Sequence, residues 1–300
     1  MRGGVGPNAG HTIEYEGKKY GLRLLPCGFP NKRSRLLIGA GVLVNPEVFL
    51  KEVKETGTEG RAGIDFRAIA IEPQHIARDK DANAKKIGTT GTGCGPAMVD
   101  RVSRIAKRVS EISELKQYVC DVEKEVNGTK DVIIEGSQGF MLSNLYGTYP
   151  FVTSKDTSAS SAAADVGLGP KSIDEVVMVI KAYTTRVGNG PFPDEIDVAE
   201  AERSGYQEYG TVTGRPRRTS PSLHFDDLRT AVRINGATQI AITKMDVRFP
   251  GNLGVRRPDS LTKEAHSFIA KVERELGVKV TLIGTGPSID DIVDLREALA

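Results

Sequence analysis

Apolar runs suited to β-strands alternate with helical patterns along the whole chain. The expected strands are residues 62–72, 131–139, 174–188, 238–246 and 278–286, and the continuous apolar character of residues 174–188 predicts a central strand. The expected helices are residues 46–55, 96–112, 225–235 and 261–277. Parallel strands must be joined by a crossover connection, which is usually a helix. The alternation therefore predicts an α/β fold with a mostly parallel central sheet and flanking helices.

The 300 residues show no internal repeat, no low-complexity segment and no linker-like shift in composition. We therefore expect a single domain over residues 1–300 with long functional loops. In open α/β sheets, ligands bind beyond the carboxyl ends of the strands. Several glycine-rich segments of this chain follow predicted strands, and we expect the chemistry there.

Charge and cysteine content exclude several classes of protein. The 41 basic and 39 acidic residues nearly balance, so no general field favours nucleic acid or a membrane surface. The three cysteines, Cys27, Cys94 and Cys120, have no metal-binding spacing and suit a reducing compartment. No apolar run approaches the roughly 20 residues of a membrane span. A soluble cytoplasmic protein is expected.

The chain opens with the glycine-rich stretch "MRGGVGPNAGHT", which ends in His11 and Thr12. Glycine lets backbone N–H groups approach a ligand closely, and phosphate is the usual ligand. The alternative is a solvent-facing terminus. A second glycine- and threonine-rich stretch, "IGTTGTGCGPA", precedes a predicted helix and suits an anion site. Its alternative is an ordinary glycine-rich turn.

Polar residues follow other predicted strands. Gln138 in "EGSQGF" and Thr153 in "YGTYPFVTSKDTSAS" suit a base edge or a phosphate, or are turn residues. The stretch "TVTGRPRRTS" places Arg215, Arg217 and Arg218 within four residues. Guanidinium groups bind carboxylates and phosphates bidentately. A solvated basic loop and an RNA-binding patch are the alternatives, although few aromatic residues stand near to stack on bases.

The strand-end sequence "ITKMD" offers chemistry specific to guanine. Asp246 can accept hydrogen bonds from the guanine N1–H and amine while the stem of Lys244 covers the ring; the alternative is a solvated pair. The small residues of "IGTGPSIDD" leave room for a flat base or a ribose. The other histidines, at positions 75, 224 and 266, are interpreted as structural.

Together, "GPNAGHT", "IGTTGTGCGPA", "EGSQG", "GTYPFVTS", "GTVTGRPRR" and "TKMD" occur in an order and at distances that resemble the adenylosuccinate synthetase family, in its shorter archaeal-type form. The resemblance covers nearly the whole chain. It implies a P-loop GTPase-like architecture and GTP-dependent ligation of IMP and L-aspartate to adenylosuccinate. That reaction proceeds through 6-phosphoryl-IMP, requires Mg²⁺, and releases GDP and phosphate.

The resemblance also implies roles for individual residues. His11 is the expected general acid, and Gly10 would offer its carbonyl to Mg²⁺. The IMP-binding residues would be Asn8, Ala9, Gly10, His11, Thr90, Arg104, Gln138, Thr153 and Arg215. Aspartate would meet Thr211, Val212, Thr213, Gly214, Arg215 and Arg217. GTP would contact Gly10, His11, Thr12, Arg217, Lys244, Met245, Asp246, Gly284, Thr285 and Gly286. Arg104 would reach into the IMP site of a neighbouring subunit, so a homodimer is expected.

The sequence departs from the family pattern in two places. The family's Gly-Asp-Glu-Gly-Lys-Gly-Lys loop, which carries the general base and cradles phosphates, does not occur in this chain. We expect the chain alone to be weakly active or inactive, and a nucleotide-binding module without catalysis is an alternative. The second departure, "RTSPSLHFDDLR", leaves open a phage-type relative that uses dGMP to make 2-amino-deoxyadenylosuccinate.

Overall fold

The computed structural model describes residues 1–296, apart from the side chains of residues 82–84. Parallel strands form two sheets and a separate pair. The first sheet has the order β3 (Leu36–Ile38), β5 (Ala62–Asp65) and β7 (Val119–Cys120), and β4 (Leu43–Val44) pairs with β6 (Ile69–Ala70). The second sheet has the order β13 (Ile292–Asp294), β12 (Val280–Gly284), β11 (Gln239–Thr243) and β8 (Val177–Lys181), with only β13 antiparallel.

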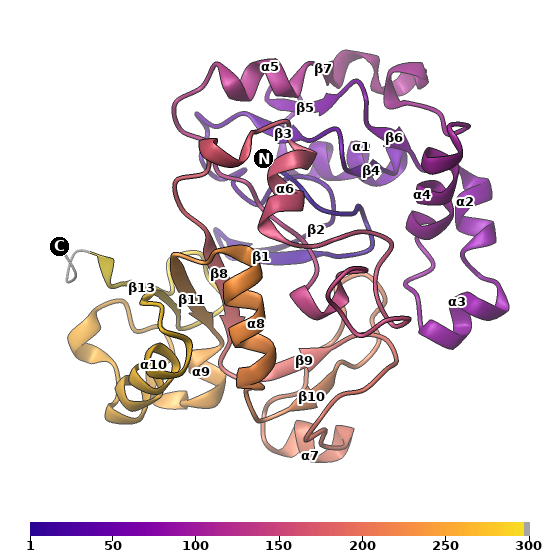
Figure 1. Cartoon of the computed structure of the whole chain (residues 1–300). Coiled ribbons are helices and arrows are strands. Elements are labelled where there is room, and N and C mark those ends of the chain that lie inside the picture. The colour runs from indigo at the N-terminus through magenta and orange to yellow at the C-terminus, as the bar shows by residue number, and fades with distance from the viewer. Residues whose placement is uncertain (297–300) are drawn as a thin grey trace.

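Two antiparallel pairs and a set of helices complete the fold (Figure 1). β1 (His11–Tyr15) pairs with β2 (Lys18–Leu22), and β9 (Thr184–Arg186) pairs with β10 (Arg218–Ser220). The α-helices are α1 (Pro46–Thr56), α2 (Pro73–Arg78), α3 (Ala82–Ile87), α4 (Cys94–Ser103), α5 (Val122–Asn127), α6 (Ala159–Asp165), α7 (Val198–Arg203), α8 (Phe225–Asn235), α9 (Met245–Arg248) and α10 (Lys263–Leu276). Within the described residues, no helix combines the length and apolar character that spanning a bilayer requires.

Sequence-encoded caps delimit the long helices. The Asn45 side chain accepts a hydrogen bond from the Val48 N–H at the start of α1, and Gly57 ends that helix in the left-handed conformation. Thr262 and Gly277 do the same for α10. A side-chain acceptor at the start and a glycine after the end satisfy backbone groups that the helix itself leaves unpaired. The expectations for residues 46–55, 225–235 and 261–277 are therefore confirmed.

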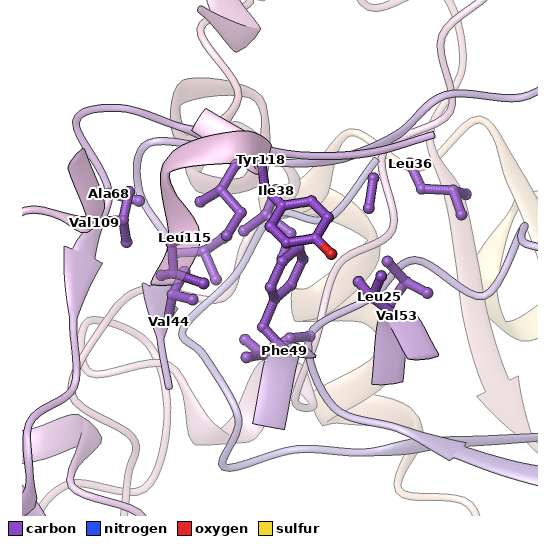
Figure 2. Packing of buried hydrophobic residues seen from close by; sticks show 14 of the residues in the cluster. Leu25, Leu36, Ile38, Val44, Phe49, Val53, Ala68, Val109, Leu115 and Tyr118 are labelled. Atoms are coloured by element: carbon purple, nitrogen blue, oxygen red, sulfur yellow. The ribbon is translucent and has the colours of Figure 1, made fainter. Parts of the chain in front are cut away.

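Separate apolar clusters support the two sheets. In the N-terminal part, Phe49 of α1 packs edge-on against Tyr118, with ring centroids 5.1 Å apart (Figure 2). The buried Ile64 of β5 belongs to the same apolar cluster. In the C-terminal part, Ile269 and Val272 of α10 pack over the second sheet. The two parallel sheets with flanking helices confirm the predicted α/β class, while the single-domain organisation stays a prediction.

Four expected elements differ from the structure. Residues 62–72 form two strands, β5 and β6, which belong to different sheets. The helix expected over residues 96–112 ends at Ser103, because Arg104 adopts a left-handed conformation, and the rest is irregular or 3₁₀. Residues 131–139 make only an isolated bridge at Glu135, and Ile133 is 84% exposed. The run 174–188 divides into β8 and β9.

The position of β8 also corrects the sequence interpretation. The continuous apolar run predicted a central strand, but β8 lies at the edge of its sheet within the described residues. Met178 and Ile180 face the apolar cluster under α10, whereas Val177 and Val179 are exposed. The apolar run therefore predicted the strand correctly but predicted its position in the sheet wrongly. The pattern shows that both faces of the strand carry apolar side chains, but it does not show which elements pack against them.

Candidate functional site

The opening loop, residues 3–10, lies where distant segments of the chain meet. Arg2, just before it, forms isolated parallel bridges to Ile38 at the end of β3 and to Glu135. The Gly4 N–H donates to the Asp165 carboxylate at 2.8 Å, which ties the loop to α6. The loop then runs into β1 at His11. It is thus an ordered connection between two sheet-forming segments rather than a free terminus.

Three of the expected nucleotide-binding residues form one hydrogen-bonded group. Asn8 Nδ2 donates to Thr153 Oγ1 at 3.1 Å, and Gln138 Nε2 donates to Asn8 Oδ1 at 2.7 Å. Gln138 has a φ of 62°, in the left-handed region that non-glycine residues seldom adopt. Such backbone conformations gather at functional sites, where surrounding contacts hold them. The group presents amide and hydroxyl functions beside the opening loop.

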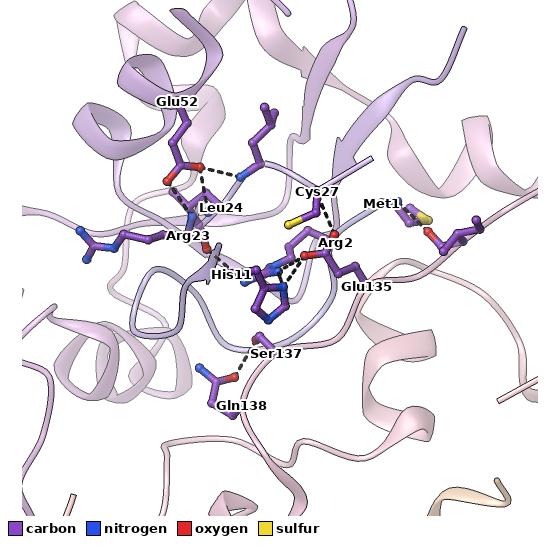
Figure 3. A network of polar contacts seen from close by, with 12 residues as sticks. Met1, Arg2, His11, Arg23, Leu24, Cys27, Glu52, Glu135, Ser137 and Gln138 are labelled. Carbon is purple, nitrogen blue, oxygen red and sulfur yellow. Dashed lines mark hydrogen bonds and ion pairs between the residues drawn. The ribbon is translucent and has the colours of Figure 1, made fainter. Parts of the chain in front are cut away.

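His11 stands at the edge of this group, in contact with a carboxylate (Figure 3). Its Nδ1 lies 2.6 Å from Glu135 Oε1, and Arg2 Nη1 donates to the same oxygen at 2.5 Å. The other oxygen, Glu135 Oε2, accepts the backbone N–H of Cys27 at 2.7 Å. Burial alone would raise the pKa of the Glu135 carboxyl, but the His11 hydrogen bond and the Arg2 charge lower it to about 2. Glu135 is therefore ionised.

The same place contains a possible metal-ligand set, which the geometry argues against for Mg²⁺. Donor atoms of His11, Cys27 and Glu135 lie within 4.8 Å of one another. Mg²⁺ prefers oxygen ligands, whereas two of these donors are nitrogen and sulfur. The Arg2 guanidinium contacts both His11 and Glu135. Burial and Glu135 also raise the pKa of the Cys27 thiol, so that sulfur is protonated. These side chains do not form a magnesium centre.

The arginine-rich stretch forms a hairpin-like loop, residues 208–217, which contacts the opening loop. The Arg217 N–H donates to the Glu208 carbonyl at 2.7 Å at its base. At its tip, the Thr211 and Thr12 hydroxyls are 3.3 Å apart, and a Cβ added to Gly10 would lie 3.0 Å from the Thr211 methyl. Gly10 thus permits the close approach of the two loops. The remaining tip residues are Val212, Thr213 and Gly214, the last with a φ of 64°.

Arg215 connects this loop to the other glycine-rich stretch. Its Nη2 donates to the carbonyls of Gly88 and Thr89, at 3.2 and 3.1 Å. Neighbouring Thr90 shares a hydrogen bond of 3.0 Å with Thr92. Arg215 is exposed and pairs with no carboxylate among the described residues. Its guanidinium is therefore available to an anionic ligand between the two loops.

A charged cluster supports the base of the loop. Glu208 accepts hydrogen bonds from Lys181 Nζ at 2.5 Å and from the Tyr183 hydroxyl at 2.7 Å. Arg217 Nε lies 3.5 Å from Glu208 Oε2, yet it is buried and makes no hydrogen bond. Burial lowers the pKa of Lys181 to about 8, with Arg217 and Lys244 adding to that effect and Glu208 opposing it. The cluster concentrates positive charge beside the expected GTP site.

The expected guanine-reading residues lie at the carboxyl ends of β11 and β12. Lys244 follows β11 with a φ of 64° and precedes α9, whose first turn holds Asp246. A Cβ on Gly284, at the end of β12, would lie 3.5 Å from the Thr243 Cα, so the two strand ends are adjacent. Met245 and Thr285 have buried side chains. These two residues can therefore offer a ligand only their backbone, as can Gly286.

One expected residue lies apart from the others. Arg104 follows α4 in the left-handed conformation, and its exposed side chain forms no hydrogen bond or ion pair with the described residues. Two functional candidates were missed by sequence reasoning, Arg2 and Glu135. Both stand inside motifs that the sequence analysis quoted, "MRGG" and "EGSQG". The only sequence signal for either residue is that it adjoins a glycine-rich stretch.

A family model described as adenylosuccinate synthetase matches residues 1–124 and 112–250. Two curated relatives are the adenylosuccinate synthetases of Archaeoglobus fulgidus, 55% identical over 304 residues, and Methanocaldococcus jannaschii, 54% identical over 307 residues. Each match covers 99% of this chain and 89% of the relative. The similarity therefore extends over all the segments that meet around the opening loop.

Two solved structures share the fold. The fully ligated adenylosuccinate synthetase of Plasmodium falciparum superposes with a TM-score of 0.91 at 26% identity, covering 98% of this chain and 92% of that one. A succinoaminodeoxyadenylate synthetase of cyanophage S-2L, bound to dGMP and dATP, gives a TM-score of 0.81 at 24% identity, covering 98% and 86%. At that identity the second likeness concerns the fold alone.

Proposed function

The chain belongs to the adenylosuccinate synthetase family, and we propose that the face formed by its opening loop, the loop 208–217 and the ends of β11 and β12 carries the family's reaction. The enzyme joins IMP and L-aspartate to adenylosuccinate, the first committed step from IMP toward AMP, with GTP converted to GDP and phosphate. The convergence of Asn8, Gln138, Thr153 and His11 on one place is the observation that carries the assignment of the site.

The chemistry needs two stages. The 6-oxygen of IMP is a poor leaving group, so the γ-phosphoryl group of GTP is first transferred to it. The aspartate amine then attacks carbon 6, and phosphate departs with the carbon–oxygen electron pair. His11 acts as the general acid that stabilises the transferring phosphoryl group. Asn8, Gln138 and Thr153 hold IMP together with Ala9, Gly10, Thr90 and Arg215. The shared hydrogen bonds of the first three support this role.

Aspartate binds along Thr211, Val212, Thr213 and Gly214, with Arg215 and Arg217 as carboxylate partners. Two features support this role: the exposed Arg215 makes no ion pair, and Arg217 Nε makes no hydrogen bond. Arginine forms bidentate pairs with carboxylates, and this geometry orients the bound aspartate, including its amine, as well as neutralising its charge. The contact between Thr211 and Thr12 brings the loop to the opening segment where the phosphoryl group is transferred.

GTP binds with its base at Lys244, Met245 and Asp246 and at Gly284, Thr285 and Gly286, and with its phosphates near Gly10, His11, Thr12 and Arg217. The adjacent ends of β11 and β12 support this placement, since nucleotides bind beyond the carboxyl ends of parallel strands. Asp246 accepts from the guanine N1–H and amine, which adenine cannot offer in the same arrangement. Lys181, Arg217 and Lys244 contribute the positive charge beside it.

Mg²⁺ is the cofactor that this reaction would use, and the Gly10 carbonyl would hold it together with phosphate oxygens of the nucleotide. The residues present fit a Mg²⁺ site that the protein shares with the nucleotide, because Mg²⁺ commonly has few protein ligands and binds phosphate oxygens of the substrate. The Glu135 carboxylate beside His11 already accepts from Arg2, His11 and Cys27. Once bound, the ion supplies charge neutralisation for the phosphates.

The active form is a homodimer in which Arg104 enters the partner's IMP site. Val99, Val102 and Ile105 on and after α4 are 56%, 70% and 72% exposed, and they flank Arg104 in the sequence. Apolar side chains clustered on one exposed helix are typical of protein–protein contacts. The unpaired guanidinium beside them fits an arginine that reaches across an interface. A cytoplasmic location agrees with three free cysteines.

An assay of the full chain with IMP, L-aspartate, GTP and Mg²⁺ tests this function, with products separated by chromatography. We expect slow formation of adenylosuccinate, GDP and phosphate in equal amounts, because the family's loop with the general base does not occur in this chain. We also expect an about 100-fold loss of kcat in His11→Asn, which keeps the shape without the acid. Replacing IMP by dGMP in a parallel reaction tests the phage-type alternative. Nucleotide binding by calorimetry without turnover would instead support a binding module and overturn the enzyme assignment.

A further inference from the structure

Glu135 gathers three hydrogen-bond donors from distant parts of the chain, and one of them belongs to His11. Arg2 Nη1 and His11 Nδ1 meet Glu135 Oε1 at 2.5 and 2.6 Å, while the Cys27 N–H meets Oε2 at 2.7 Å (Figure 3). Arg2 is only 2% exposed, so its charge is buried and paired. The carboxylate is therefore fixed from two sides before it contacts the imidazole.

The short contact between His11 and Glu135 determines which ring nitrogen carries a proton. A carboxylate oxygen 2.6 Å from Nδ1 requires a proton between the two atoms, since two lone pairs would otherwise face each other. Glu135 is ionised, so that proton belongs to Nδ1. Arg2 Nη1 also lies 3.0 Å from Nδ1, but a protonated Nδ1 has no lone pair to accept from it, so Arg2 donates to the carboxylate oxygen instead. The second nitrogen, Nε2, remains free of protein partners among the described residues.

We propose that Glu135, held by Arg2 and the Cys27 N–H, is the positioning residue of His11: it fixes the ring with its proton on Nδ1 and directs Nε2 toward the bound nucleotide. This inference rests on the proposed function of the site. An imidazole whose Nδ1–H is bound to a carboxylate can receive, hold and donate a proton only at Nε2. Figure 3 shows the His11 ring pointing away from Glu135 on the side of Ser137 and Gln138, and Gln138 in turn donates to Asn8.

The alternative is that Glu135 only neutralises the buried charge of Arg2. In that case His11 is a neighbour that happens to share the carboxylate, and its ring would keep its orientation and tautomer without Glu135. The two roles of Glu135 predict different orientations and tautomers of the His11 ring when Glu135 is removed, as well as a change in protein stability. The position of the His11 proton therefore separates them.

The first experiment is ¹⁵N NMR of the full chain with labelled histidine at about pH 8, without substrates. The chain has four histidines, and His11→Asn identifies the signals of His11. We expect the wild-type His11 to show a protonated Nδ1. A proton on Nε2 with Nδ1 free in the wild type overturns the inference. This measurement involves no turnover, so it remains decisive if the proposed function fails.

The second experiment removes the partner. Glu135 cannot be replaced alone without leaving Arg2 buried and unpaired, so the variant is the double substitution Arg2→Met with Glu135→Leu. We expect the Nδ1–H signature of His11 to give way to a mixture of tautomers. We also expect kcat to fall about 100-fold while KM for IMP changes less than about threefold. An unchanged tautomer, or kcat within twofold of wild type, supports the purely structural role.

Two further variants guard against a general loss of folding. Glu135→Asp retains a carboxylate at a shorter reach, and we expect it to restore part of kcat and of the Nδ1–H signal. Glu125→Gln breaks another arginine–glutamate pair, in which Arg35 donates through Nε and Nη2 at 3.1 Å, on α5. It should leave the His11 spectrum and kcat unchanged. If Glu125→Gln lowers kcat as much as the double variant does, the loss reports stability and the inference fails.

Discussion

At the scale of single residues, buried charge explains most of the order in the opening loop. Arg2 is among the most deeply buried side chains of the protein, and a guanidinium cannot lose its charge on burial. It must therefore find an anion within reach, and Glu135 supplies one from a segment more than a hundred residues away. An unpaired charge there would be strongly unfavourable. The pair joins the first residues of the chain to the segment that carries Gln138.

The depressed pKa of Glu135 predicts a specific acid sensitivity. Its folded-state pKa is about 2, below the usual 4.5, so its contribution to stability is fully present above about pH 4.5. That contribution is lost as the pH falls through 2, because protonation then favours the unfolded chain. We expect it to amount to about 3 kcal/mol. Urea unfolding between pH 5 and 2 should show the free energy of unfolding falling less steeply with pH in the double variant Arg2→Met with Glu135→Leu than in the wild type. Parallel curves would contradict this.

At the scale of elements, the loop 208–217 combines a fixed base with an adaptable tip. The base is held by Glu208 with Lys181 and Tyr183, and by the N–H of Arg217. The tip makes one long hydroxyl contact and the two carbonyl contacts of Arg215. A loop of this kind keeps its arginines near the site while leaving the ligand-facing groups free to change partners.

Two arginines of this segment should respond differently to the same substitution. Arg218 forms an ion pair with Glu195 and donates to the carbonyls of Gly188 and Gly190, so it acts structurally. Arg215 has no acidic partner in the part of the chain that the structure describes. We expect Arg215→Lys to raise KM for aspartate at least about tenfold with little change in Tm, because a lysine loses the bidentate geometry.

Arg218→Lys is the matched control, and we expect it to lower Tm while KM for aspartate stays within about twofold. Steady-state kinetics and thermal unfolding of both variants give the answer. If Arg218→Lys, rather than Arg215→Lys, raises KM for aspartate, then the assignment of the aspartate site to the tip of the loop is wrong.

At the scale of the whole molecule, the exposed apolar residues fall into separate regions with different consequences. Val99, Val102 and Ile105 accompany Arg104 near α4, whereas Val177 and Val179 lie on the edge strand β8. Only the first set adjoins a residue that the family resemblance places at a subunit interface. The proposed homodimer therefore predicts that the effect of a charged substitution depends on where the exposed valine lies and not on how exposed it is.

We expect Val102→Asp to convert the dimer to a monomer in light scattering, because it places a charge in an apolar contact. KM for IMP should rise as well, since Arg104 no longer reaches the partner's site. Val179→Asp is the matched control: Val179 is 66% exposed, close to the 70% of Val102, and its substitution should leave the mass unchanged. A monomeric wild type, or dissociation by Val179→Asp instead, would refute the proposed interface.

The sequence alone determined the α/β class, the long helices and the motifs around the opening loop. Capped amphipathic helices such as α1 and α10, and runs such as β11 and β12, carry their signals within about fifteen consecutive residues. The glycine-rich motifs likewise indicate ligand-binding loops, because glycine is the residue that lets the backbone approach a ligand closely. The family resemblance then supplied expected roles for His11, Arg215 and Asp246.

Only the tertiary structure decided which residues pair across the chain. Nothing local in "MRGG" or "EGSQG" indicates that Arg2 and Glu135 meet, or that both contact His11. The early end of α4 and the edge position of β8 also depended on neighbours that are distant in sequence. The physical reason is the same in each case. Burial, pairing of charge and coverage of a strand are properties of the packed molecule, which a short window of sequence does not contain.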